Sequence, residues 1–133
     1  MSRALSESAP GRRLRWLPWI FAIGAVFWLV QLTQFAAVLA APAGREQLQQ
    51  TLVNAGFTAN AAAMLAVEAV IIVFFESSAV ALHACAYYGL RRYQPWGWVA
   101  AVITAAAWSL VVLGIPMLVF LLQRRTRAAY GIP

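Results

Sequence analysis

The longest apolar run of the chain, residues 61–88, most constrains what this protein can fold into, because it has the length of a membrane-crossing helix. About twenty apolar residues cross the hydrocarbon of a bilayer as a helix. Similar runs occupy 20–41 and 99–122, and 63% of all residues are hydrophobic. Only 11% are charged, against about a quarter in a soluble domain. We therefore expect an all-α integral membrane protein, a small bundle of three apolar segments.

Arginine, tryptophan and proline mark the ends of these runs, as expected at a headgroup boundary and in the first turn of a helix. Between the first two runs, Leu48 and Leu52 lie one helical turn apart in a polar stretch, which predicts a short amphipathic surface helix from Arg45 to Ala55. The predicted organisation is a disordered basic tail at 1–15, a single transmembrane helical domain at 16–123 and a basic C-terminal tail at 124–133. Its helices are expected at about 17–41, 60–90 and 96–113, with a short return limb at 116–129.

The first run also allows another interpretation. A basic stretch, an apolar run and the small residues 37–43 are the parts of a signal peptide. Signal-peptide apolar regions are usually about 7–15 residues long, and this run is longer. The length favours an uncleaved membrane anchor.

The third run contains Gly114 and Pro116, and proline inside a helix removes a hydrogen bond and crowds the preceding turn. We expect a break there, which gives four helices, while a single kinked helix is the alternative. Basic residues favour the cytoplasmic side, so a break that returns the chain leaves only Arg45 outside and places the N-terminus in the cytoplasm. The arginines expected at the headgroups of anionic lipids are Arg12, Arg13, Arg15, Arg91, Arg92, Arg124, Arg125 and Arg127.

Three ionisable residues, Glu68, Glu76 and His83, interrupt the apolar run at 61–88 and share one face of a helix, since each residue advances about 100°. Such groups at membrane depth need a structural or functional reason. Counting helical rise from the flanking arginines brings Gln31 and Ser109 to the depth of Glu76, with Gln34 nearby. These side chains form the candidate intramembrane polar site.

Two functions fit this site. In the first, a protonated Glu76 donates a hydrogen bond to Gln31 or to another subunit, and the protein is a non-enzymatic accessory or assembly subunit that acts through helix–helix contacts. Such contacts contribute about 0.6–2 kcal/mol each. In the second, a small oligomeric transporter or conductor moves protons or ions along Glu68, Glu76 and His83, with water bridging gaps of about 10–12 Å. The expected partners are the lipid bilayer and further copies or other membrane subunits.

No motif indicates enzymatic chemistry. The chain has no nucleophile motif or phosphate-binding loop, so we expect no catalytic residue. His83 and Cys85 are two residues apart, which places them on different faces of a helix, so no metal and no cofactor is expected. The net charge of +6 lies at the edges of apolar runs and not on one soluble face, so nucleic acid is not an expected partner.

The segments 89–92, 95–98 and 125–130 resemble those of small polytopic membrane proteins of bacteria. An alanine-rich chain with arginine as its only basic residue besides His83 is typical of GC-rich bacterial genomes. The resemblance implies a multi-pass protein of the bacterial inner membrane, and it assigns no chemistry.

Overall fold

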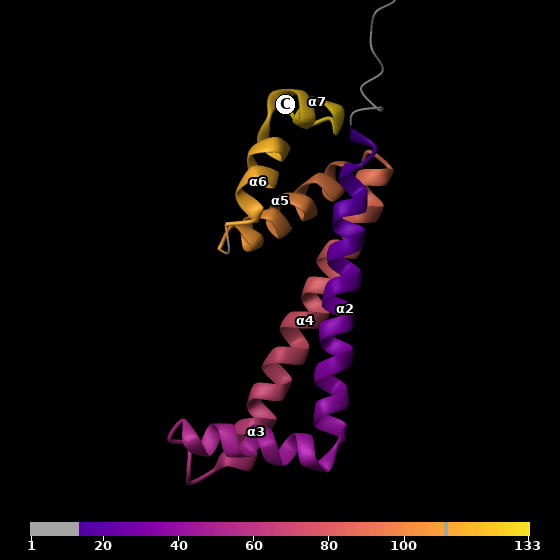
Figure 1. Ribbon diagram of the computed structural model, residues 1–133. Helices are drawn as coiled ribbons and strands as arrows, with labels where there is room; N and C mark the ends of the chain where they lie inside the picture. Colours follow the sequence, from indigo (N-terminus) through magenta and orange to yellow (C-terminus); the bar gives the residue numbers. More distant parts are fainter. Residues whose placement is uncertain (1–13, 111) are drawn as a thin grey trace, which may run out of the picture. The chain divides into compact units, whose positions relative to one another are not determined.

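The computed structural model describes residues 14–110 and 112–133. These residues contain no strand, which confirms the predicted all-helical class. The first thirteen residues, with Arg12 and Arg13 of the predicted tail, lie outside the described residues. The helices in chain order are α2 (Leu17–Ala40), α3 (Pro42–Asn54), α4 (Ala61–Arg91), α5 (Pro95–Ser109), α6 (Gly114–Leu122) and α7 (Arg124–Ala129) (Figure 1).

Two of these helices, α2 with 24 residues and α4 with 31, are long and apolar enough to cross a membrane. Their bounds agree within one residue with the helices predicted at 17–41 and 60–90. Local chemistry sets the ends. Pro42 begins α3, and Pro95 begins α5 after Tyr93, whose positive φ of 54° ends the preceding helical path. Proline is favoured in the first turn because its missing N–H would have no partner there.

The chain forms two compact units, whose boundaries fall inside α2 and α4. Among the described residues, unit 1 contains 14–25, 81–110 and 112–133, and unit 2 contains 26–80. The single membrane domain predicted for 16–123 stays a prediction.

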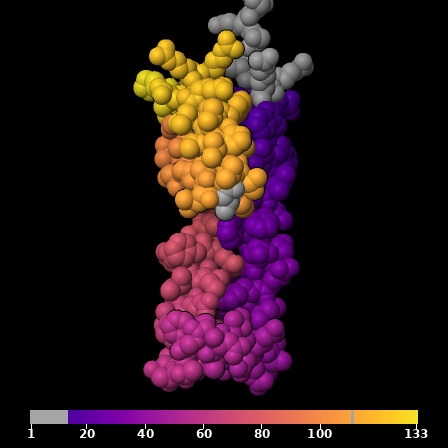
Figure 2. All heavy atoms as spheres, turned by 60° about the vertical axis from the view of Figure 1, so that its left-hand side comes forward, coloured from indigo at the N-terminus to yellow at the C-terminus, as the bar shows by residue number. Residues whose placement is uncertain are grey.

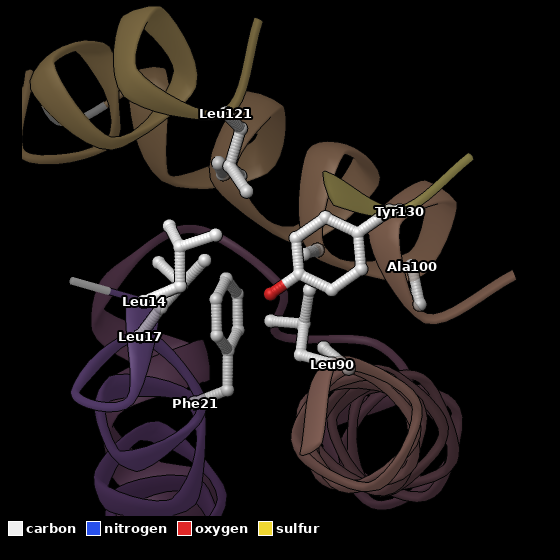
Figure 3. Close-up of a cluster of buried hydrophobic side chains, with 10 residues drawn as sticks. Leu14, Leu17, Phe21, Leu90, Ala100, Leu121 and Tyr130 are labelled. Atoms are coloured by element: carbon white, nitrogen blue, oxygen red, sulfur yellow. The ribbon is translucent and has the colours of Figure 1, made fainter. Parts of the chain in front are cut away.

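Unit 1 has the main buried cluster, in which Figure 3 shows the Tyr130 ring among Phe21 of α2, Leu90 of α4 and Ala100 of α5. Helices α4 and α5 meet at two glycines: a Cβ added to Gly97 would lie 2.3 Å from the Cα of Gly89. Small residues permit this approach of one backbone to another. The buried members of the cluster are Leu14, Leu17, Phe21, Ala86, Leu90, Ala100, Ala101, Ala105, Leu121 and Tyr130.

The third apolar run is broken, as predicted near Gly114–Pro116. Helix α5 ends at Ser109, four residues before the predicted end, and α6 begins at Gly114. Pro116 is the third residue of α6, where a missing N–H is tolerated, so it lies in a first turn and does not kink a longer helix. The predicted return limb at 116–129 is two helices, because Gln123 leaves the helical conformation with ψ at 138°. The described residues thus contain one helix more than expected after the break.

Unit 2 consists of α3 with the adjoining parts of α2 and α4. Helix α3 confirms the short helix predicted from Arg45, and it starts earlier, at Pro42. Leu48 and Leu52 are half-buried on one of its faces. Leu65 is the one buried residue of this unit, so most of its apolar side chains are exposed.

Candidate functional site

The two glutamates of the predicted polar site lie in unit 2 and differ in environment. Glu68 is exposed on α4, and Glu76 is half-buried. One carboxylate oxygen of Glu76, Oε2, is buried and has no hydrogen-bond partner among the described residues. An unpaired polar atom away from water costs free energy, about 1–3 kcal/mol or more for a charged group. Glu76 is therefore the least satisfied of the candidate residues.

Gln31 and Gln34, the polar residues predicted to accompany Glu76, lie on the α2 part of unit 2 and are both exposed. The nearby Thr33 hydroxyl donates to the carbonyl of Leu29 at 2.8 Å, one turn earlier in the same helix. Side-chain hydroxyls in apolar helices commonly satisfy themselves in this way. The amides of Gln31 and Gln34 thus face outward on this unit.

His83 belongs to unit 1 and is 4% exposed. The indole Nε1–H of Trp108 on α5 donates to its Nε2 at 3.1 Å, and the two rings are nearly perpendicular at 89°. A nitrogen that accepts a hydrogen bond carries no proton, so this geometry fits a neutral imidazole protonated at Nδ1. The Phe21 ring lies 6.2 Å from the imidazole on the α2 side.

Gly24 completes the surroundings of His83. A Cβ at position 24 would lie 2.2 Å from Cδ2 of the imidazole, so only glycine leaves room for the ring as it stands. Neither Gly24 nor Trp108 was among the predicted site residues. The available signal was chemical: a buried tryptophan N–H needs an acceptor, and the chain has one histidine.

Ser109, predicted at the depth of Glu76, donates from Oγ to the carbonyl of Ala105 at 2.8 Å within α5. The buried Thr104 hydroxyl does the same to Ala100. Ser109 therefore uses its donor inside its own helix.

Two arginines of unit 1, Arg91 and Arg92, lie beside aromatic rings. Arg91 Nη1 donates to the Tyr87 hydroxyl at 2.9 Å, and the Arg92 guanidinium lies 4.3 Å from the centre of the Tyr88 ring. Arg15, Arg124 and Arg125 are exposed, while Arg127 is half-buried and donates to the Pro133 carbonyl. Cation–π contact and hydrogen bonding hold Arg91 and Arg92 at the end of α4 with their charges toward solvent.

Tyr130 follows α7 and is 1% exposed. Its hydroxyl has no hydrogen-bond partner among the described residues, and its ring stacks on Tyr93 at 5.6 Å. Burial, with a smaller contribution from Tyr93, raises the pKa of Tyr130 to about 12, because the phenolate would lose its hydration.

No group of three His, Cys, Asp or Glu side chains that could hold a metal ion occurs in the part of the chain that the structure describes. Comparison with protein-family models, with curated proteins and with solved structures gave no significant match. Interpretation of the site therefore depends on its own chemistry.

Proposed function

We propose that the protein is a multi-pass protein of the cell membrane in which α2 and α4 cross the bilayer. The support is their length and apolar character, together with exposed side chains such as Phe27, Val70 and Phe74. An exposed apolar surface of this extent is a liability in water and is ordinary against lipid. The N-terminus is cytoplasmic, because the arginines around α4, α5 and α7 then share its side and Arg45 lies opposite.

Within the membrane, we propose a non-enzymatic role as an accessory or assembly subunit that acts through helix–helix contacts. The observation that carries this proposal is the unpaired Oε2 of Glu76. A buried carboxyl oxygen in an apolar helix needs a donor, or a proton and an acceptor, and a helix of another subunit or of a second copy supplies either. The exposed amides of Gln31 and Gln34 and the exposed carboxyl of Glu68 also need hydrogen-bond partners from another helix, because lipid cannot solvate them.

The test compares Glu76→Leu with Glu76→Gln in the full chain, extracted in mild detergent and run on blue-native gels. Glutamine keeps both a donor and an acceptor, so we expect Glu76→Gln to migrate in the same assembly as the wild type. Leucine keeps the volume and removes the polar atoms, so Glu76→Leu should shift to a smaller species. Phe75→Leu, at an exposed neighbour, is the matched control and should not shift. A wild-type protein that runs as a monomer, or Glu76→Leu in an unchanged complex, would refute the contact role.

The second candidate is a small oligomeric proton or ion conductor. The exposed carboxyl of Glu68 and the unpaired Oε2 of Glu76 favour it, because a proton path needs ionisable groups that no neighbouring side chain holds. His83 is a poor relay as it stands, since its Nε2 already accepts from Trp108. Proteoliposomes with an internal pH dye decide the matter: a flux that is lost in Glu76→Gln supports conduction, and a flux that persists in this variant, or none in the wild type, excludes it.

A further inference from the structure

The third apolar run forms a helical hairpin too short to cross a bilayer. Helix α5 has 15 residues and α6 has 9, which correspond to about 22 Å and about 13 Å at 1.5 Å per residue. The hydrocarbon of a bilayer is about 30 Å thick. Neither helix is long enough to cross. The length of α6 and that of residues 99–109 of α5, about 16 Å, each match about half of the hydrocarbon thickness.

Contacts along both limbs show that the chain reverses between them. At the open end, the indole Nε1–H of Trp98 donates to the carbonyl of Leu121 at 3.0 Å. At the closed end, a Cβ on Gly114 would lie 2.1 Å from the carbonyl oxygen of Ala105 and 2.4 Å from the amide nitrogen of Ser109. The two helices are therefore antiparallel and in backbone contact at the turn. Figure 2 shows their side chains as one continuous body within unit 1.

The closed end is apolar and exposed. Leu110 is 89% exposed and Leu113 is 74% exposed, the two largest values among the large apolar side chains described. Val112 has a positive φ of 69°, a conformation that Gly or Asn usually provides. Val112 is thus an apolar, β-branched residue at a position where glycine would be less strained, and it adds to the apolar surface of Leu110 and Leu113.

Three backbone donors around the turn are hydrogen-bonded within the hairpin, which lowers the cost of placing this part of the turn in lipid. Non-helical backbone at membrane depth is tolerated only when its polar groups are satisfied locally. The amide of Leu110 donates to Ala107, the amide of Val112 donates to Ser109, and the amide of Ile115 donates back to Val112. These donors of the turn are thus used within the hairpin.

The open end is charged on both limbs. Arg91 and Arg92 precede α5, and Arg124 and Arg125 begin α7, one residue after α6 ends, all of them exposed. Trp96 and Trp98 lie in the first turn of α5 beside them. Arginine with tryptophan is the pattern of a headgroup boundary, and here both limbs meet it at the same end of the hairpin.

We propose that α5 and α6 form a re-entrant hairpin, which enters the cytoplasmic leaflet, places Leu110, Val112 and Leu113 against acyl chains near the bilayer centre, and returns to the same side. The arginines at its open end bind anionic headgroups of that leaflet. This inference rests on the proposed membrane location and adds that the third apolar run never crosses. The protein then crosses the membrane twice.

Site-directed labelling tests the inference in the full chain. Cys85 is the only cysteine, so Cys85→Ala gives a background for single cysteines at Gln50, Gln94, Leu113 and Gln123. Sealed membrane vesicles of both orientations are treated with a membrane-impermeant maleimide. We expect Gln94→Cys and Gln123→Cys to react from one side and Gln50→Cys from the other. Leu113→Cys should react only after detergent is added.

A spin label at Leu113→Cys identifies what surrounds the tip. We expect strong relaxation by oxygen and weak relaxation by a water-soluble nickel chelate, the signature of acyl chains. Weak relaxation by both reagents would place the tip against protein, and strong relaxation by nickel would place it in water; either result overturns the inference. Labelling of Gln94→Cys and Gln123→Cys from opposite sides would do the same by showing a full crossing. Release of the protein by alkaline carbonate would instead refute the membrane location itself.

Discussion

The contact between Gly89 and Gly97 gives the sharpest test of how α4 and α5 hold together in unit 1. An alanine Cβ at position 97 would lie 2.3 Å from both Cα and C of Gly89 and 2.6 Å from the amide nitrogen of Leu90. Ordinary contact begins near 3.4 Å, so the helices must separate by about 1 Å. The atoms met are backbone atoms, which no rotamer change can move.

The expected cost of Gly97→Ala follows from two opposing effects. Overpacking costs about 1–3 kcal/mol, and the upper part of that range applies because rigid backbone is displaced. Alanine recovers up to about 1 kcal/mol through its better helix propensity. We expect a net loss of about 2 kcal/mol in the free energy of unfolding, since the clash outweighs the propensity gain.

Equilibrium unfolding in mixed micelles, followed by tryptophan fluorescence, measures this loss. Ala106→Gly, at an exposed position of the same helix, is the control for propensity alone and should lose about 1 kcal/mol. A Gly97→Ala variant as stable as the wild type, or more stable, would show that the close approach of α4 and α5 is not required.

Three further predictions concern hydrogen bonds and titration in unit 1. Trp98→Phe removes the donor to the Leu121 carbonyl and should lower the free energy of unfolding by about 1 kcal/mol in the same assay; an unchanged value would contradict the contact. Selective ¹⁵N labelling of His83, the only histidine, should show the neutral tautomer with its proton on Nδ1; the spectrum should change in Trp108→Phe, and a proton found on Nε2 would rule out the hydrogen bond from Trp108. Tyr130 should ionise near pH 12, seen as a late step in phenolate absorbance that Tyr130→Phe lacks. Because its pKa is raised above the ordinary 10.0, the stability it contributes is complete below pH 10 and is lost as the pH rises toward 12.

Helix positions could be predicted from the sequence because apolar run length and proline placement act locally. The start of α3 at Pro42 and of α5 at Pro95 follows from the geometry of one residue. The break before Gly114 was predictable for a related reason, although its mechanism was not, since Pro116 lies in a first turn. Helix α5 ends at Ser109, four residues before the predicted end. At this end Gly114 packs against the backbone of α5, a tertiary contact that the sequence pattern does not contain.

The hydrogen-bond partners of the polar side chains could not be predicted. Helical periodicity shows which residues share a face of one helix, but it does not show which other helix packs against that face. Glu76 and His83 share a face of α4 by their spacing, yet His83 is buried against Trp108 and Glu76 retains an unpaired oxygen. The difference arises from α5, which supplies an indole N–H to His83. No pattern within 61–88 contains that information.

The two units differ in how completely their polar groups are used, and this difference indicates where another subunit would act. In unit 1, His83, Thr104 and Ser109 all make hydrogen bonds within the unit. Among its described residues, the buried side-chain atoms without a partner are Arg127 Nε in α7 and the Tyr130 hydroxyl directly after it. In unit 2, the Thr33 hydroxyl is satisfied within α2, whereas the long polar side chains Gln31, Gln34 and Glu68 are exposed and Glu76 keeps an unpaired oxygen. A polar group in lipid is stable only when another group pairs with it, so the demand for a partner is concentrated in unit 2. Substitutions that weaken assembly should therefore map to residues 26–80, while substitutions in unit 1 should lower the stability of the subunit and leave its contacts intact.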